Sequence, residues 1–190
     1  MARIGAREFA MKGGVCVVRS PEEHEAAAVL ECARDVFATS AFTLTQSDEF
    51  TYSVEQEADL IRQRAADPHA LFIVACEGTA NGRMIGISNV WPGPKRKVRH
   101  VGTIGMSVHS AYRFRGIGKA MMRAMVDWGE SVATLHMLDL AVYAANTPAR
   151  KLYESFGFVQ HAYLPDGCRH DDGSLWDQIS MHRMLHRAGG

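Results

Sequence analysis

The chain contains, at positions 112–120, the segment Tyr112-Arg113-Phe114-Arg115-Gly116-Ile117-Gly118-Lys119-Ala120. Residues 101–109, just before it, alternate between apolar and small or polar types, and this period of two predicts a β-strand. Residues 117–128 carry apolar side chains at spacings of three and four, which predicts an amphipathic helix. The segment is therefore a basic turn between a strand and a helix, and its glycines let a ligand approach the backbone closely.

Such a turn has the chemistry of an anion site. Backbone N–H groups at a helix N-terminus have no partner within the helix, and they attract negatively charged groups. Arg113, Arg115 and Lys119 add positive charge. We interpret the turn as a site that suits a pyrophosphate; a bare surface turn with scattered basic residues is the alternative.

Two better-known phosphate-binding loops do not fit this turn. A P-loop needs Ser or Thr after its lysine, where Ala120 stands, and the Rossmann fingerprint needs a third glycine where Met121 stands. The pattern that fits is Arg-x-x-Gly-x-Gly, formed by Arg113, Gly116 and Gly118. It resembles the coenzyme A pyrophosphate loop of the GNAT superfamily, the acyl-coenzyme-A-dependent N-acetyltransferases.

A second motif supports the same resemblance. Residues 138–142 alternate like a strand, and residues 146–158 read Asn-Thr-Pro-Ala-Arg-Lys-Leu-Tyr-Glu-Ser-Phe-Gly-Phe. Asn146 is a predicted N-cap, Pro148 lies in the first turn, where its missing N–H does no harm, and Gly157 ends the helix. This resembles the GNAT arrangement Asn-x-x-Ala-x-x-Leu-Tyr-x-x-x-Gly-Phe. One helix and one strand separate the two motifs, as in the family.

The remaining elements follow an order that matches the same fold. Ser20-Pro21-Glu22-Glu23 and Ser53-Val54-Glu55-Gln56 both have the form of a capping box that opens a helix. The other predicted segments are a strand at 15–19, a loop at 41–52, hairpin strands at 71–76 and 83–90, a strand at 159–163, a polar loop at 165–173 and a final strand at 176–184. The resemblance therefore implies an α/β (α+β) GNAT fold, with a central mixed, mostly antiparallel sheet, helices on both faces and splayed central strands.

The resemblance also implies which residues hold acetyl-coenzyme A, the expected co-substrate. They are the backbone of Met106, Ser107 and Val108, the turn formed by Arg113, Phe114, Arg115, Gly116, Ile117, Gly118, Lys119 and Ala120, and the side chain of Asn146. Phe114 departs from the family pattern, since many members have glycine there. Tyr153 occupies the family position whose hydroxyl protonates the departing sulfur. An ordinary aromatic side chain that packs under Phe156 is the alternative for Tyr153.

The general base is not identified by the sequence. Many relatives place a glutamate on the central strand, but residues 101–108 contain no acid. His109 has a suitable unperturbed pKa and equally suits a solvated strand end. Asp139, Glu77 and an ordered chain of water molecules remain as alternatives.

Charged residues give two further hypotheses about ligands. The basic cluster before the central strand could receive an acidic substrate or the ribose phosphate of coenzyme A, or it could be a solvated loop; its members are Lys95, Arg96, Lys97 and Arg99. The loops at 41–52 and 165–173 should flank the acceptor cleft by analogy with the fold. Their acids suit a cationic amine, with Asp48, Glu49, Asp171 and Asp172 the residues that we expect to gather at the cleft mouth.

Cysteine and histidine patterns predict no metal site and no disulfide framework. Cys16, Cys32, Cys76 and Cys168 are scattered and form no Cys-x-x-Cys pair. His182 and His186 are four residues apart in the polar C-terminal end, and Cys168, His170, Asp171 and Asp172 share one loop. Neither group has a second cluster that would complete a ligand set, so we expect no metal.

Length and charge indicate one compact catalytic domain. The chain has 190 residues, of which 47% are hydrophobic, enough for a sizeable core. We place the domain at residues 15–187, and we treat residues 1–14 as a lead-in that is disordered or that precedes a functional start at Met11. Zero net charge gives no bulk attraction to nucleic acid or to an anionic membrane. Without a membrane-span-sized apolar run or a signal-peptide core, we expect a cytoplasmic protein.

The resemblance implies an N-acetyltransferase that moves an acetyl group from acetyl-coenzyme A to a primary amine by direct attack in a ternary complex. The amine belongs to a small molecule or to a protein or peptide N-terminus, and a homodimer is an open possibility. The alternative is a non-catalytic acyl-coenzyme-A-binding sensor or interaction module of the same fold. Tyr153 and the acidic loops favour the enzyme, whereas the missing glutamate base favours the binding module.

Overall fold

The structure is a computed structural model of the chain, and it describes residues 3–185. At its centre lies one sheet of eight strands in the spatial order β1-β2-β3-β4-β5-β6-β8-β7. Neighbouring strands are antiparallel except β5 and β6, which are parallel. The strands are β1 (Arg7–Met11), β2 (Gly14–Arg19), β3 (Leu71–Glu77), β4 (Met84–Pro92), β5 (Val101–Val108), β6 (Met137–Tyr143), β7 (Val159–Arg169) and β8 (Leu175–Met184).

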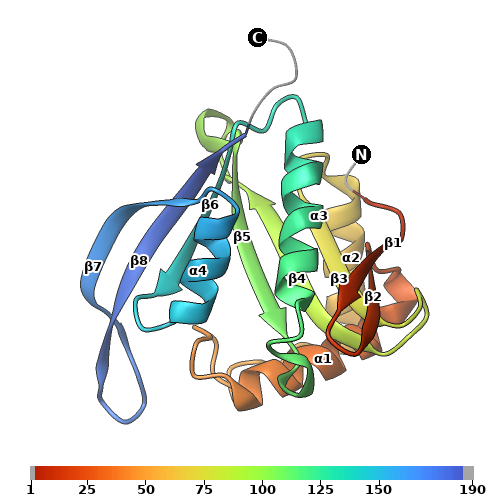
Figure 1. Cartoon of the computed structure of the whole chain (residues 1–190), viewed down its shortest axis with the longest axis horizontal. Helices are drawn as coiled ribbons and strands as arrows, with labels where there is room; N and C mark the ends of the chain where they lie inside the picture. The colour runs from red at the N-terminus through yellow and green to blue at the C-terminus, as the bar shows by residue number, and fades with distance from the viewer. Residues whose placement is uncertain (1–2, 186–190) are drawn as a thin grey trace.

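Helices cover both faces of this sheet. The helices are η1 (Glu23–Glu25), α1 (Ala26–Thr39), α2 (Val54–Ala66), η2 (Arg96–Val98), η3 (Ser110–Tyr112), α3 (Ile117–Ser131) and α4 (Thr147–Ser155), where η marks a short 3-10 helix. Figure 1 shows α3 and α4 on the face toward the viewer and α1 and α2 on the far side. The predicted fold class, a mixed and mostly antiparallel sheet between helices, is confirmed.

Strand β3 shows why the core has two parts. All of its residues from Leu71 to Cys76 are buried, because both faces of the sheet are covered at this strand. Leu71, Ile73 and Ala75 pack with the apolar stripe of α3, whereas the residues between them pack with α1 and α2. Burial of each large apolar side chain contributes roughly 1.5–3 kcal/mol. The continuous apolar run of β3 therefore fixes helices to both faces of the sheet.

The two central strands separate along their length. Strands β5 and β6 pair only at Val101–Met137, Gly102–Leu138 and Thr103–Asp139. Beyond this point β5 pairs with β4 alone, so one edge of β5 has no strand beside it. Figure 1 shows β5 and β6 diverging from their shared end. The predicted splay of the central strands is confirmed.

Several local predictions are confirmed at the level of single hydrogen bonds. The Ser53 hydroxyl accepts from the Gln56 N–H, and the Gln56 side chain accepts from the Ser53 N–H, so this capping box forms as predicted. The Asn146 side chain caps α4 by accepting from the Ala149 N–H. Gly157 follows α4 with a φ of +79°, the left-handed conformation that ends a helix.

The N-terminal segment differs from the prediction. Residues 7–11 of the expected lead-in form β1, which pairs antiparallel with β2. Phe9 and Met11 pack on the α3 side of the core, which gives this short polar strand its tertiary support. Strand β1 thus belongs to the sheet, and Ile4 packs against the same core. The first two residues and the predicted C-terminal boundary at 187 lie outside the described residues.

Two further predictions are wrong in their details. Ser20 does not cap the first helix, because its hydroxyl accepts from the Ile4 N–H instead, and Glu22 and Glu25 form the capping box. The polar loop expected at 165–173 is mostly strand, since β7 continues to Arg169 with shifts in register. Strand β7 lies at the edge of the sheet with exposed side chains, so it lacks the apolar alternation that identifies a strand.

Candidate active site

The glycine turn adopts the conformation that its sequence requires. Gly116 is the N-cap of α3 and has a φ of +93°, which is open to glycine but strained for other residues. Gly118 has a tight neighbour, because an added Cβ would lie 3.2 Å from Leu152 Cδ2 on α4. Phe114 has a φ of +62° and is 85% exposed. The family preference for glycine at this position therefore has a conformational reason.

The turn presents a helix N-terminus. The first intrahelical donor is the Ala120 N–H, which bonds to the Gly116 carbonyl at 3.1 Å. The N–H groups of Ile117, Gly118 and Lys119 precede it and have no partner within the helix. Ile117 is buried and anchors the turn to the core. The arrangement fits a pyrophosphate, with three donors and the positive end of the α3 dipole.

The basic residues of the turn have different surroundings. The Arg115 guanidinium lies over the Tyr112 ring at 5.1 Å, and Arg115 and Lys119 are both exposed. The Arg113 guanidinium points elsewhere, because it donates to the Val108 carbonyl and to the carbonyl and hydroxyl of Thr39. The sequence predicted that all three residues add charge to the anion site. In the structure, Arg115 and Lys119 remain available to an anion, and Arg113 is bound to α1.

The free edge of β5 supplies a second set of backbone groups. The His109 N–H and the Val101 carbonyl both bond toward β4. Since backbone groups of successive residues point to opposite edges of a strand, Met106 and Val108 point toward β6. The Val108 carbonyl already accepts from Arg113, so its N–H and the two backbone groups of Met106 are the ones left without a strand partner. No strand pairs with β5 there, so these groups can bind an extended ligand. Ser107, also predicted to bind the coenzyme, is paired with Ile87 on β4 and turns its backbone away.

Tyr153 lies on α4, which packs beside the turn through Leu152. It is 8% exposed, and its ring packs against Phe158 at 6.0 Å rather than under Phe156. Burial raises the pKa of Tyr153 to about 12. Within residues 3–185 its hydroxyl has no hydrogen-bond partner. A protonated phenol without a protein partner fits a proton donor to a ligand.

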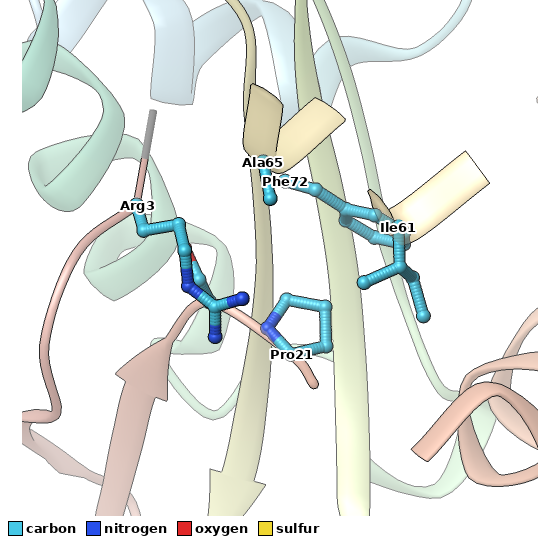
Figure 2. A pocket seen from close by; sticks show the side chains of 6 residues that line it. Arg3, Pro21, Ile61, Ala65 and Phe72 are labelled. Atoms are coloured by element: carbon cyan, nitrogen blue, oxygen red, sulfur yellow. The ribbon is translucent and has the colours of Figure 1, made fainter. Parts of the chain in front are cut away.

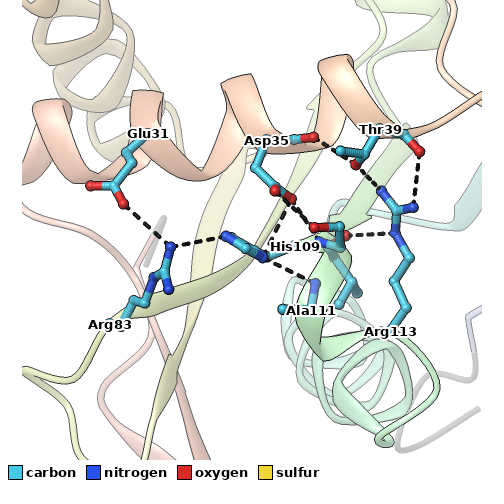
Figure 3. A network of polar contacts seen from close by, with 9 residues as sticks. Glu31, Asp35, Thr39, Arg83, His109, Ala111 and Arg113 are labelled. Carbon is cyan, nitrogen blue, oxygen red and sulfur yellow. Dashed lines mark hydrogen bonds and ion pairs between the residues drawn. The ribbon is translucent and has the colours of Figure 1, made fainter.

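His109 is not the solvated strand end that the sequence allowed. It is 7% exposed, and it belongs to the polar network of Figure 3. Its Nε2 atom lies 3.1 Å from a guanidinium nitrogen of Arg83, and its Nδ1 atom lies 3.4 Å from Asp35. A guanidinium can only donate, so Nε2 is the acceptor in this contact. Nδ1 also accepts from the Ala111 N–H at 3.3 Å, so protein groups already contact both ring nitrogens.

The other candidate bases also have partners. Asp139 accepts a hydrogen bond from the Thr103 hydroxyl at 2.7 Å, at the end where β5 and β6 are still paired. Glu77 accepts from the Tyr112 hydroxyl at 2.6 Å. The geometry therefore favours none of the three residues as the base.

The basic cluster lies far from the glycine turn. It precedes β5 and the turn follows β5, so the eight residues of the strand separate them by about 26 Å. Arg99 is also occupied, since its guanidinium donates to both carboxylate oxygens of Asp67 at 2.7 Å. This separation contradicts a role for the cluster in binding the coenzyme at the turn.

The two loops expected beside the acceptor cleft meet through aromatic rings. Phe42 lies 5.7 Å from Trp176 and 6.2 Å from Tyr143, and His170 lies 4.1 Å from Trp176. The predicted acids are all exposed, and no hydrogen bond or ion pair joins them within residues 3–185; they are Asp48, Glu49, Asp171 and Asp172. This aromatic contact was not predicted, and its signal in the sequence was Phe42 in a mostly polar loop.

Enclosed cavities do not form the site. A void of about 10 Å³ between the N-terminal segment and α2 holds one water molecule at most; its lining includes Ile61, Ala65 and Phe72 (Figure 2). A wider hollow of about 240 Å³ lies between α1 and the β3–β4 hairpin. Neither lining includes a residue of the turn or of α4. The candidate site is instead the unpaired edge of β5, beside the glycine turn.

Among residues 3–185, no three His, Cys, Asp or Glu side chains are placed to share a metal ion. His186, one half of a predicted pair, lies outside the described residues. No helix in the described part is long and apolar enough to span a membrane.

Comparisons with known proteins agree with this geometry. The model of the acetyltransferase (GNAT) family matches residues 38–158. L-amino acid N-acetyltransferase AaaT of Escherichia coli (strain K12) is 30% identical over 98 residues, which are 51% of this chain and 59% of that protein. The match thus spans little more than half of that relative's length.

Solved structures share the fold over nearly the whole chain. A GNAT-family acetyltransferase from Streptococcus pneumoniae superimposes with a TM-score of 0.84 at 23% identity, covering 90% of this chain and 99% of that one. The putative acetyltransferase yncA of Salmonella typhimurium, solved with its cofactor acetyl-CoA, gives a TM-score of 0.79 at 17% identity, covering 92% and 96%.

Proposed function

The chain belongs to the acetyltransferase (GNAT) family, and on that premise we propose that it transfers an acetyl group from acetyl-coenzyme A to a primary amine. One observation carries the proposal: β5 loses its neighbour after Thr103, and the glycine turn follows the free end of the strand. A Cβ on Gly118 would lie 3.6 Å from Met106 Cε, so the helix N-terminus adjoins the free strand edge. An extended ligand that ends in a pyrophosphate fits both features.

The proposed binding mode assigns each part of the coenzyme to a chemically matched surface. The N–H groups of Ile117, Gly118 and Lys119 hold the pyrophosphate, and Arg115 and Lys119 add charge. The backbone groups of Met106 and Val108 bond the pantetheine arm as an added strand would. Asn146, which caps α4, provides a side-chain amide near the same end of β6.

In the proposed chemistry, the chain polarises the thioester carbonyl and supplies one proton to the departing sulfur. When bound, acetyl-coenzyme A supplies the acetyl group as a thioester. The neutral amine attacks the thioester carbon while the Met106 N–H stabilises the charge that develops on oxygen. The carbon–sulfur bond then breaks, and Tyr153 gives its proton to the departing thiolate. The amine nitrogen loses a proton to water, which restores the phenol through solvent, and no other reactant is consumed.

The acceptor is proposed only as a class. It is a primary amine of a small molecule or of a peptide N-terminus, which attacks directly in a ternary complex. Likeness to an L-amino acid N-acetyltransferase supports amino acids as the first compounds to test. The exposed acids of the two flanking loops are compatible with a cationic amine. The aromatic contact of Phe42 with Trp176 also gives the acceptor side an apolar wall.

Free thiol release tests the proposal against the binding-module alternative. The purified chain is mixed with acetyl-coenzyme A and a panel of amino acids, polyamines, aminoglycosides and peptides, and thiol is measured together with acetylated product. The proposal expects amine-dependent thiol release that Tyr153→Phe strongly reduces. Coenzyme binding by calorimetry with no amine-dependent release would support the binding module. Absence of binding would refute both.

A further inference from the structure

Arg113 connects the end of β5 to the end of α1. Its Nε atom donates to the Val108 carbonyl at 3.2 Å, and its two terminal nitrogens donate to the carbonyl and the hydroxyl of Thr39 at 3.1 and 2.8 Å. Thr39 is the last residue of α1, so its carbonyl has no partner within that helix. Figure 3 shows the guanidinium between the two segments. Two of its nitrogens thus donate to the last residue of α1, and a third donates to the last residue of β5.

A second contact holds the same two segments together. Asp35 of α1 accepts from the Ser110 N–H at 2.6 Å and from the Ser110 hydroxyl at 2.8 Å. Burial alone raises the pKa of this carboxyl, but the two bonds from Ser110 outweigh it, so the pKa of Asp35 lies below its usual value. Four residues separate Asp35 from Thr39, so both contacts come from one turn of α1. The coenzyme turn is therefore bound to α1 on two sides.

The chain that leaves α1 has contacts with both the end of β5 and the end of β6. We call residues 39–43 the strap. At one end Thr39 is held by Arg113, which follows β5. At the other end Phe42 packs on Trp176 of β8, and the Tyr143 hydroxyl at the end of β6 lies 3.5 Å from the Thr43 carbonyl. The strap thus joins the coenzyme turn to the acceptor-side aromatic contact.

We propose that Arg113 is a positioning residue, which fixes the coenzyme turn against Thr39 and so couples coenzyme binding to the order of the strap. The proposal rests on the proposed function, because it assumes that the turn binds coenzyme A. It differs from the sequence expectation, in which the Arg113 charge acts on the phosphates themselves. A guanidinium fork is suited to the role, since three fixed bonds hold its direction.

Calorimetry with coenzyme A separates positioning from direct contact. The proteins are the wild type, Arg113→Gln, Thr39→Val and the double variant. If Arg113 acts through Thr39, Arg113→Gln weakens binding roughly 5- to 150-fold and Thr39→Val also weakens it. Thr39→Val removes only the bond to the hydroxyl, so its effect is the smaller of the two. The double variant then resembles Arg113→Gln to within about twofold, because Arg113→Gln has already removed that bond. The proposal would be overturned, in favour of direct phosphate contact, if Arg113→Gln weakens coenzyme A binding, Thr39→Val does not, and the loss caused by Arg113→Gln is the same with and without Thr39→Val.

Two controls make every outcome decisive. Arg115→Gln removes the same charge from the same turn but not the bond to Thr39, so its effect should add to that of Thr39→Val. Unfolding midpoints are measured for each variant. A lower midpoint with unchanged coenzyme affinity would mean that Arg113 is only structural, and it would overturn the proposal. If the wild type itself fails to bind coenzyme A, the proposed function fails and not this inference alone.

Hydrogen exchange tests the coupling to the strap. Saturating coenzyme A should slow amide exchange at residues 40–43 in the wild type severalfold. The same addition should leave these amides unchanged in Arg113→Gln, even when coenzyme A is raised to saturate the variant. Equal slowing in both proteins, or none in a wild type that binds coenzyme A, would overturn the coupling.

Discussion

Replacement of Gly118 by valine should weaken coenzyme A binding without unfolding the domain. The residue is the second of α3, and helix propensity favours valine over glycine by a few tenths of a kcal/mol. Its Cβ would lie 3.2 Å from Leu152 Cδ2, which is tight, but Leu152 is only partly buried and can move. We therefore expect the free energy of unfolding to change by about 1 kcal/mol or less.

The effect on binding should be much larger. The two methyl groups of valine would stand where the phosphates must approach the backbone, so at least one N–H-to-phosphate bond is lost. A hydrogen bond to a charged group contributes about 1.5–3 kcal/mol, which corresponds to roughly ten- to 150-fold in affinity. Calorimetric titration with coenzyme A measures this directly, and thermal unfolding checks the fold.

Gly129 offers a matched control on the same helix. A Cβ there would lie 3.3 Å from Leu185 Cδ1, so it is as tight as Gly118, but it is eleven residues further along α3. Gly129→Val should therefore lower stability more than affinity. Unchanged coenzyme A affinity in a folded Gly118→Val protein would refute the placement of the pyrophosphate at this turn.

Three further predictions follow from the same geometry. Tyr153→Phe should lower turnover roughly 10²–10⁴-fold with little change in coenzyme affinity, as steady-state kinetics would reveal; an unaltered rate means that another group protonates sulfur. The pKa of Tyr153 is about 12 in the folded chain and about 10 when unfolded. The wild type should therefore lose free energy of unfolding between pH 10 and 12 relative to Tyr153→Phe, as a pH titration of stability would show. Equal losses in the two proteins would contradict the burial of Tyr153. Asp35 has a lowered pKa, so the stabilisation that its carboxylate contributes is present above about pH 4 and is lost below. The difference in melting temperature between the wild type and Asp35→Asn should therefore shrink as the pH falls through this range. A constant difference would argue against the ionised contact with Ser110.

The sequence predicted those parts of the fold that depend on local chemistry. The Asn146 cap and the Ser53 capping box need only residues within a few positions, and both form. The same reasoning failed at Ser20, because its hydroxyl accepts from Ile4, a partner sixteen residues away. Strand β1 was missed for a similar reason, since its support comes from β2 and α3 rather than from its own pattern.

The candidate site, like the fold, has parts that the local sequence predicts and parts that it does not. The glycine turn and α4 follow from motifs, whose spacing is visible in the chain. The contact of Arg113 with Thr39 joins residues 74 positions apart, and nothing in either local sequence indicates it. The charge of Arg113 was visible, but its direction depends on how α1 packs against the end of β5.

The proposed function requires that acetyl groups pass from acetyl-coenzyme A to an amine at the unpaired edge of β5. The most direct measurement is the simultaneous assay of free thiol and of acetylated amine by mass spectrometry across the amine panel. We predict at least one amine for which both products appear in equal amounts, at a rate that Tyr153→Phe strongly reduces. Tight binding of acetyl-coenzyme A with no acetylated amine, and with thiol release no faster than without protein, would contradict the account.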